Sequence, residues 1–331
     1  MNDIDRIKLD RLNKTFERNF RVTRMFAEYL ERYPEVITKE MIDTLTQDGS
    51  ITKSEALVAL LSEIFALDFE KAEDRKIIRD YLTPSVRILD KNKYTSNAYY
   101  KNIRLEEIKD GAWEIRQEEY PAYRGVICDD MIIGDDFSEI PPLGFFTESF
   151  KFPAILENGN EWMTLTPVDL DTCEDAIKAA KGKVVTFGLG LGYYAYMVSE
   201  KPEVESVTVV ELSSEVIGLF EKHILPKMPN RNKIRIINCD AFEYAKNQMP
   251  KERFDLAFVD TWRDASDGAP MYRKMKKLEE LSPDTKFMYW IENFLISRIR
   301  AENYARIADS IDCGGYVPNC YEEVVKKIKN I

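Results

Sequence analysis

Three glycines, Gly188, Gly190 and Gly192, follow the apolar run of residues 184–187 in the order FGLGLGYY. Glycine permits a tight turn and lets a bound molecule approach the backbone, because it has no β-carbon. A helix that begins after such a turn offers its N-terminus to negative charge. The spacing is GxGxG, and Tyr193 stands where the dinucleotide-binding pattern GxGxxG needs its last glycine. The turn indicates a ligand-binding loop that departs from the NAD pattern.

Acidic residues follow the next two apolar runs. Glu211 ends the run SVTVVE, next to Leu212, and Asp240 with Ala241 follows the run IRIINC. Because an ionised carboxylate only accepts hydrogen bonds, Glu211 can bind both hydroxyls of a ribose. The Asp240 side chain and the Ala241 N–H can recognise the edge of an adenine. With the glycine turn, these residues predict an adenosine site, in which we include Leu212.

A fourth apolar run ends at Asp260 and continues as TWRDASDGAP. Asp260 can remove a proton or offset a substrate cation. Trp262 and Arg263 can form an aromatic wall with a cation against its face. Asp264 and Asp267 either help to bind a cationic substrate or belong to a solvated loop. We predict that Asp260, Trp262 and Arg263 act on the substrate.

The elements that carry these residues alternate between apolar runs and helical stretches. The runs cover residues 184–187, 206–210, 234–237, 255–259 and 287–291. Strands that are apolar throughout and alternate with helices form parallel sheets covered on both faces. Ligands bind such sheets at the carboxyl ends of the strands. The sequence therefore predicts an α/β fold with a doubly wound, mostly parallel sheet, and one binding edge.

Residues 1–165 differ from this alternating pattern in composition and in the spacing of their apolar residues. Residues 1–110 carry apolar residues at helical spacing and a capping pair, Thr52 and Glu55, which predicts a helical N-terminal domain. Residues 111–165 are β-branched and aromatic, with a hairpin expected at Asn158-Gly159, and predict a small antiparallel β segment. Residues 166–331 form the predicted Rossmann-like domain.

The motifs FGLGLG, VVELSSEV, INCDAFEYA and FDLAFVDTW together resemble those of class I S-adenosylmethionine-dependent methyltransferases. The resemblance implies that S-adenosylmethionine is the cofactor and that the three glycines line its methionine part. It also implies that Glu211 holds the ribose, that Asp240 and Ala241 hold the adenine, and that Asp260 faces the methyl group. We predict a methyltransferase that acts on a small molecule or another non-nucleic-acid acceptor. The final antiparallel strands usual in that family are not evident after Ile291.

Two alternatives remain open. The loop after Asp260, with the upstream hairpin and the TPVDLDT helix, also resembles the spermidine synthase branch of this fold, which implies an aminopropyltransferase. The chain could instead be a non-catalytic cofactor-binding module whose N-terminal helices bind a protein. Tyr193 and Tyr194 either cover the cofactor or pack in the core. The tyrosines of TSNAYYKN, Tyr99 and Tyr100, are candidates for a substrate lid.

Composition limits the remaining classes. The chain has 331 residues, of which 44% are hydrophobic and 32% charged, with a net charge of −11. The acidic balance disfavours nucleic acid, and no apolar run approaches the roughly 20 residues of a membrane span. Five scattered cysteines and one histidine, His223, form neither a disulfide framework nor a metal site. We expect a cytoplasmic protein without metal, with a small-molecule substrate and with self-association through its N-terminal helices.

Overall fold

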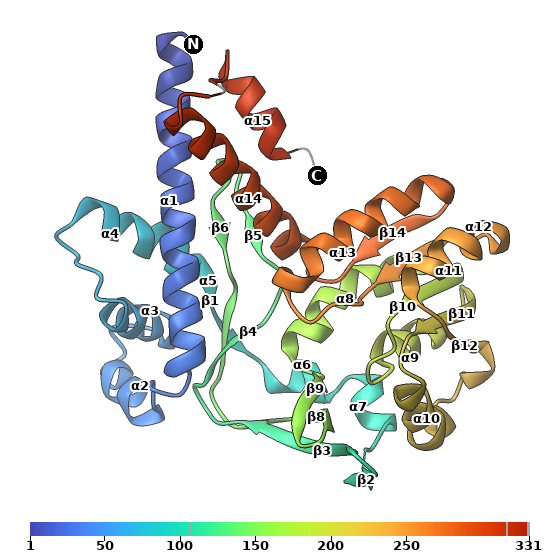
Figure 1. The fold of residues 1–331 in the computed structure, drawn as a ribbon. Helices are drawn as coiled ribbons and strands as arrows, with labels where there is room; N and C mark the ends of the chain where they lie inside the picture. The colour runs from blue at the N-terminus through green and yellow to red at the C-terminus, as the bar shows by residue number, and fades with distance from the viewer. Residues whose placement is uncertain (106, 316, 330–331) are drawn as a thin grey trace. The chain divides into compact units, whose positions relative to one another are not determined.

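The computed structural model describes residues 1–105, 107–315 and 317–329. They form two compact units, shown in Figure 1. Unit 1 is assembled from residues 1–89, 121–149 and 293–331, and unit 2 from residues 90–120 and 150–292. The contacts therefore do not follow the three consecutive segments 1–110, 111–165 and 166–331, because the chain leaves each unit and returns to it.

Unit 1 combines helices from both ends of the chain with short strands. Its helical elements are α1 (Asp3–Arg32), α2 (Lys39–Thr46), α3 (Lys53–Ile64), α4 (Ala72–Ile77), η1 (Ile78–Leu82), α5 (Thr83–Ser85), α14 (Glu292–Asp312) and α15 (Tyr321–Lys329). Its strands are β1 (Val86–Leu89), β4 (Gly125–Ile127), β5 (Ile132–Ile133), β6 (Glu139–Ile140) and β7 (Leu143–Phe146). Strand β7 pairs with β1 in parallel and with β4 in antiparallel orientation.

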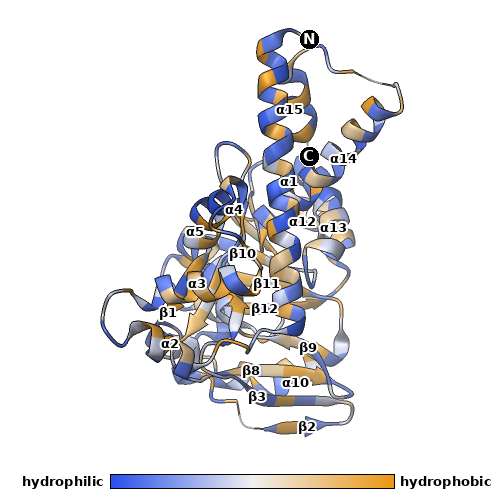
Figure 2. Ribbon diagram, turned by 90° about the vertical axis from the view of Figure 1, so that its left-hand side faces the viewer, coloured by the Kyte–Doolittle hydropathy of each residue, from blue (hydrophilic) through white to orange (hydrophobic). Residues whose placement is uncertain are grey.

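The long helix α1 explains why the C-terminal segment belongs to unit 1. Its colours in Figure 2 change between hydrophilic and hydrophobic along its length, as expected for an amphipathic helix. Leu12 and Phe16 of its apolar stripe form a cluster with Ile307 of α14 and with Val324 of α15. The Phe16 ring stacks on Tyr304 at 4.1 Å. Burial of these apolar faces favours the return of α14 and α15 to α1.

Unit 2 holds a small antiparallel sheet and a larger parallel one. The smaller sheet has the order β2 (Ile108–Asp110), β3 (Trp113–Tyr120), β8 (Phe150–Glu157), β9 (Asn160–Thr164). The predicted hairpin between β8 and β9 is confirmed, with Asn158 and Gly159 both at positive φ. However, the segment 111–165 does not form one β region, because residues 125–146 pair within unit 1.

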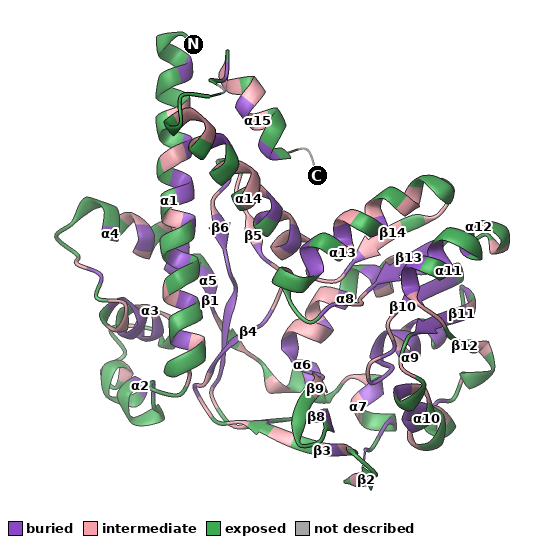
Figure 3. Cartoon of the chain, viewed as in Figure 1, coloured by how far each residue is buried: buried purple, intermediate pink, exposed green. Residues whose placement is uncertain are grey.

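The larger sheet confirms the predicted α/β class. Its order is β12 (Ile234–Asn238), β11 (Val204–Glu211), β10 (Gly182–Phe187), β13 (Leu256–Val259), β14 (Lys286–Tyr289), and all neighbours are parallel. Numbered along the chain, the strand order is 3-2-1-4-5, which is a doubly wound arrangement. Strands are added on one side of β10 first and then, from β13 on, on its other side. Figure 3 shows β10, β11 and β13 largely buried. After β14 the elements of the described chain are helical, as expected from the sequence.

Helices and short helical turns connect the strands of unit 2. They are α6 (Lys91–Thr95), α7 (Ala98–Asn102), α8 (Pro167–Ala179), α9 (Tyr193–Ser199), α10 (Ser214–His223), η2 (Leu225–Lys227), η3 (Arg231–Lys233), α11 (Ala241–Asn247), α12 (Met249–Glu252), α13 (Ala265–Leu278) and η4 (Glu279–Leu281). Helix α8, expected from the TPVDLDT motif, begins with Pro167, and Asp169 accepts hydrogen bonds from Thr166. In the described residues, we find no helix whose length and apolar character would suit a membrane span.

Candidate active site

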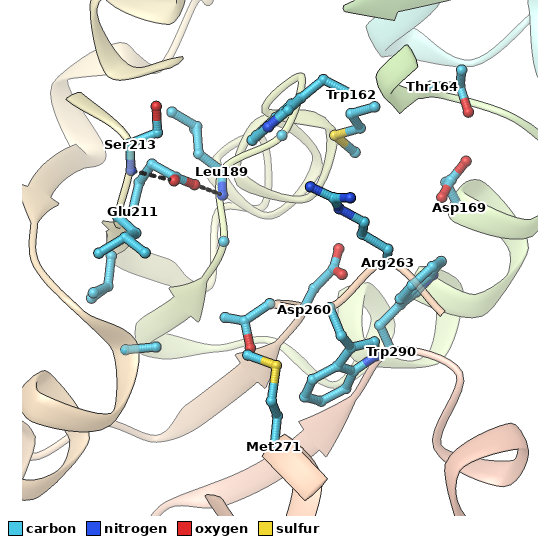
Figure 4. Close-up of a pocket in the computed structure, with 18 of the residues that line it drawn as sticks. Trp162, Thr164, Asp169, Leu189, Glu211, Ser213, Asp260, Arg263, Met271 and Trp290 are labelled. Atoms are coloured by element: carbon cyan, nitrogen blue, oxygen red, sulfur yellow. Dashed lines mark hydrogen bonds between the residues drawn. The ribbon is translucent and has the colours of Figure 1, made fainter. Parts of the chain in front are cut away.

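A pocket of about 630 Å³ opens at the carboxyl edge of the parallel sheet in unit 2 (Figure 4). This volume lies in the range typical of small-molecule sites. Residues that follow β10, β11, β12, β13 and β14 line it, together with strand β9 and the start of α8. The predicted residues in the lining are Gly188, Gly190, Glu211, Leu212, Asp240, Ala241, Asp260, Trp262 and Arg263.

The glycine turn is shaped by close packing. All three glycines have positive φ, +99° at Gly188, +51° at Gly190 and +74° at Gly192. A β-carbon on Gly188 would collide with the backbone carbonyl of Asp260, and one on Gly190 with the side chain of Met163. Gly192 faces Phe220 of α10 instead and does not line the pocket. The prediction that Gly192 lines a cofactor is therefore not supported, because its lack of a side chain serves helix packing.

Glu211 connects the glycine turn to the end of β11. Its carboxylate is buried and accepts hydrogen bonds from the N–H of Leu189 at 3.0 Å and from the N–H of Ser213 at 2.8 Å. Each carboxylate oxygen has a second lone pair that can accept a hydrogen bond, so ribose hydroxyls remain suitable partners. Leu212 beside it is 69% exposed and offers an apolar surface to the pocket.

Asp240 begins helix α11. Its Oδ1 accepts hydrogen bonds from the N–H of Phe242 at 2.9 Å and of Glu243 at 3.0 Å. This capping role was not considered in the sequence analysis, and it fixes the side chain in place. Asp240 and Ala241 both line the pocket. They follow β12, which pairs with β11 at Glu211 and Asn238, so they are placed for an adenine next to a ribose.

Asp260 lies at the end of β13 and projects into the centre of the pocket. Burial, together with the negative charges of Asp169 and Glu211, raises its pKa to about 8. Burial also raises the pKa of Asp169 to about 6, although Thr166 donates two hydrogen bonds to it. Two carboxyl groups whose proton affinities lie near neutrality therefore line the same pocket, which suits proton transfer.

Trp262 and Arg263 follow Asp260 along the loop. Trp262 is buried, stacks on Tyr289 at 6.3 Å and lines the pocket, so it can serve as an aromatic wall. Arg263 also lines the pocket, but no cation–π contact of the described residues involves it. The expected cation against an aromatic face is therefore absent from this part of the chain.

Asp264 and Asp267 form the N-terminal cap of α13. The Asp264 carboxylate accepts a hydrogen bond from the N–H of Ser266 at 2.6 Å, and Asp267 accepts one from the N–H of Asp264 at 3.1 Å. Neither residue lines the pocket. The hypothesis that they bind a substrate cation is therefore not supported, because their carboxylates hold backbone N–H groups.

The tyrosines proposed as covers for the site belong to the core of unit 2. Tyr194 stacks on Phe258 at 4.3 Å, and the Tyr193 hydroxyl accepts a hydrogen bond from Asn97. The Tyr99 hydroxyl donates to the carbonyl of Leu191, and that of Tyr100 to the carbonyl of Leu165. None of the four tyrosines lines the pocket. The lid hypothesis is corrected accordingly.

Several lining residues were missed in the sequence. Asp169 was not among the residues that we predicted to bind a ligand, yet its carboxylate lies on the pocket wall. Trp290 directly follows β14, so the rule that ligands bind at carboxyl ends of strands could have identified it. Trp162 and Met163 come from β9 in the antiparallel sheet, and no local signal in the sequence points to them. The described chain has no cluster of three or more His, Cys, Asp and Glu residues suited to a metal ion.

Part of this chain is similar in sequence to a curated protein. Residues of this chain are 29% identical over 102 residues to polyamine aminopropyltransferase 2 of Caldanaerobacter subterraneus subsp. tengcongensis. The match covers 30% of this chain and 34% of the relative, so it spans about a third of that enzyme. No family model matches the chain.

Solved structures with some similarity include two crystal structures of spermidine synthase and one of a decarboxylase. The spermidine synthase of Thermotoga maritima is 13% identical, with 60% of this chain and 61% of that chain covered and a TM-score of 0.33. The same values apply to a spermidine synthase in complex with the transition state analogue AdoDATO. A precorrin 8W decarboxylase of Methanobacterium thermoautotrophicum is 17% identical, with 43% and 70% covered and a TM-score of 0.28.

The curated match contradicts the prediction of a methyltransferase, which is therefore wrong. The name of the matched relative describes an aminopropyltransferase, which is the first alternative given by the sequence analysis. The fold class does not depend on this correction, because the strand order 3-2-1-4-5 is seen in the chain itself.

Proposed function

We propose that unit 2 transfers an aminopropyl-type group from an adenosyl sulfonium donor to an amine. The observation that carries the proposal is the charge of the pocket. Five carboxyl groups line it, those of Glu161, Asp169, Glu211, Asp240 and Asp260. An excess of carboxylates attracts cations, and this reaction brings a sulfonium and an ammonium together.

The glycine turn and Glu211 support binding of the donor. Gly188 and Gly190 line the pocket, and Glu211 has hydrogen-bonding capacity for the ribose. Asp240 and Ala241 are available to the adenine, because β12 before them pairs with β11 before Glu211. The resulting orientation brings the sulfonium toward Asp260 at the end of β13.

Asp260 would accept the proton that the acceptor loses. An aliphatic amine is an ammonium ion at neutral pH, since its pKa is about 10. With its pKa raised to about 8, Asp260 is a stronger base than an ordinary carboxylate. The amine nitrogen then attacks the methylene carbon bonded to sulfur, the carbon–sulfur bond breaks with its electrons on sulfur, and the proton stays on Asp260. The positive charge passes from sulfur to the nitrogen, so neutral methylthioadenosine and a secondary ammonium ion leave the site.

The proposal is tested by incubating the full chain with decarboxylated S-adenosylmethionine, or with S-adenosylmethionine, and a panel of primary amines with and without a carboxylate. We expect mass spectrometry to detect methylthioadenosine, and the rate to rise with pH through an apparent pKa at or below about 8. Asp260→Asn should lower turnover about a hundredfold or more, while the exposed control Asp284→Asn should not. Formation of S-adenosylhomocysteine without methylthioadenosine, or full turnover by Asp260→Asn, would overturn the proposal.

A further inference from the structure

One lining residue does not fit a pocket built only for cations. Arg263 is the single Lys or Arg among the lining residues of the described chain. Figure 4 shows its guanidinium extending into the pocket above Asp260, between Trp162 and Asp169. Arginine presents several N–H donors in a planar fork that matches a carboxylate. The positive charge of Arg263 would repel ammonium ions, so it does not suit a pocket that binds only amines.

The backbone at Arg263 is held in place, so the point from which this exposed side chain extends is set by the fold. Its N–H donates to the Asp267 carboxylate at 3.2 Å, beside the cap of α13. The guanidinium itself makes no hydrogen bond or ion pair to the described residues. The pKa of Asp264 is lowered chiefly by the hydrogen bond from the Ser266 side chain, and the charge of Arg263 adds only a minor contribution.

Arg263 also does not neutralise the carboxylate closest to the chemistry. The pKa of Asp260 is raised by burial and by the charges of Asp169 and Glu211, and no cation of the described chain offsets them. The pocket therefore presents acidic groups and one guanidinium that forms no ion pair with the described residues. This separation of charge complements a ligand that carries both an ammonium and a carboxylate.

The wall next to Arg263 contains further polar atoms without partners. The hydroxyl of Thr261 and the indole N–H groups of Trp262 and Trp290 are buried and make no hydrogen bond within the described residues. All three residues line the pocket. A buried donor without a partner is unfavourable, so small rotations or an intervening water that linked these atoms to a bound anion would be favoured.

From this arrangement we infer that a substrate of this pocket carries a carboxylate, which pairs with Arg263 while its amine faces Asp260 and Asp169. The inference rests on the proposed function and narrows it to an amino-acid-type substrate. The carboxylate belongs either to the donor, as in S-adenosylmethionine itself, or to the acceptor, as in a diamino acid.

Binding of matched ligand pairs tests the inference without requiring transfer. The donor pair is S-adenosylhomocysteine and its decarboxylated form. The acceptor pair is 2,5-diaminopentanoate and 1,4-diaminobutane, each measured with methylthioadenosine present. Calorimetry should show tighter binding of the carboxylate-bearing member in one pair, which identifies the source. In Arg263→Met that member should lose about tenfold to a hundredfold in affinity, and its partner should lose none.

Two further variants separate recognition from structure. Arg263→Lys should retain part of the selectivity, because it keeps the charge but loses the planar fork. Arg253→Met, at an exposed arginine of unit 2 outside the pocket, should leave both pairs unchanged. Equal losses for both members of each pair, or no preference for the carboxylate in the wild-type protein, would overturn the inference. Selective binding without any group transfer would overturn the proposed function and leave the inference standing.

Discussion

Gly188 and Asp260 lie in direct contact at the point where the strand order of the parallel sheet reverses, between β10 and β13. Gly188 follows β10 and Asp260 follows β13, and the Asp260 N–H donates to the carbonyl of Phe187 at 2.9 Å. A β-carbon on Gly188 would occupy the space of the Asp260 carbonyl oxygen. The glycine that opens the ligand-binding turn thus also sets the position of the carboxyl group to which we assign proton transfer.

The contact predicts a strong effect of Gly188→Ala. Alanine at φ +99° is strained, by an amount on the order of 1–3 kcal/mol, and its methyl group would displace the Asp260 backbone. We expect a lower melting temperature together with loss of methylthioadenosine binding, measured by thermal unfolding and calorimetry. Gly218→Ala is the matched control, because Gly218 is exposed on α10 with open space around it. The control should be neutral or stabilising. Similar behaviour of the two variants would contradict the prediction.

Glu211→Ala should weaken binding of methylthioadenosine about tenfold to a hundredfold. The variant removes the acceptor for the ribose and also leaves the N–H groups of Leu189 and Ser213 without their partner. A loss of stability should therefore accompany the loss of affinity, which calorimetry and thermal unfolding measure separately. Glu215→Ala, which removes an exposed carboxylate of α10, is the control. Unchanged affinity with a lower melting temperature would leave Glu211 with a structural role alone.

Asp260→Asn should stabilise the protein in a pH-dependent way. The pKa of Asp260 is raised to about 8 in the folded protein, whereas an unfolded aspartate has a pKa of about 3.9. Between these values the unfolded chain releases a proton that the folded chain keeps, so stability falls as the pH rises. Asparagine does not titrate, so the melting temperature of the variant should exceed that of the wild type by a margin that widens from pH 5 to pH 8.

The exposed variant Asp284→Asn should show no such widening. If the difference between Asp260→Asn and the wild type is the same at every pH, the carboxyl group does not titrate in this range. Its assignment as the base would then lose its support.

The cap of α13 distinguishes structural from chemical roles for the loop acids. Asp264→Ala removes an acceptor for the N–H of Ser266 and should cost about 0.5–2 kcal/mol of stability. Asp264→Ser removes the charge but keeps a capping oxygen. This variant should keep most of the stability and the turnover of the wild-type protein. Thermal unfolding and the methylthioadenosine assay check both. If the serine variant were stable yet inactive, the negative charge of Asp264 would act on the substrate.

Much of the site could be predicted from the sequence. The five strands of the parallel sheet are short apolar runs between helices, and each strand end that carries a glycine or an acid is visible as a local pattern. Because parallel strands bring their carboxyl ends to one edge, Gly188, Glu211, Asp240 and Asp260 could be assigned to one pocket before the structure. These features depend on local periodicity and on a general rule of sheet topology.

Only the tertiary structure decided the rest. The roles of Gly192, against Phe220, and of Asp264, at the cap of α13, depend on which neighbours the folded chain supplies. The same holds for Asp169 and Met163, which join the pocket from segments that precede the parallel sheet. The sequence alone determined the strands and the acids at their ends, since those patterns are local. Packing between distant segments determined which side chains face the ligand and which carboxyl group keeps its proton, because burial and neighbouring charge exist only in the folded chain.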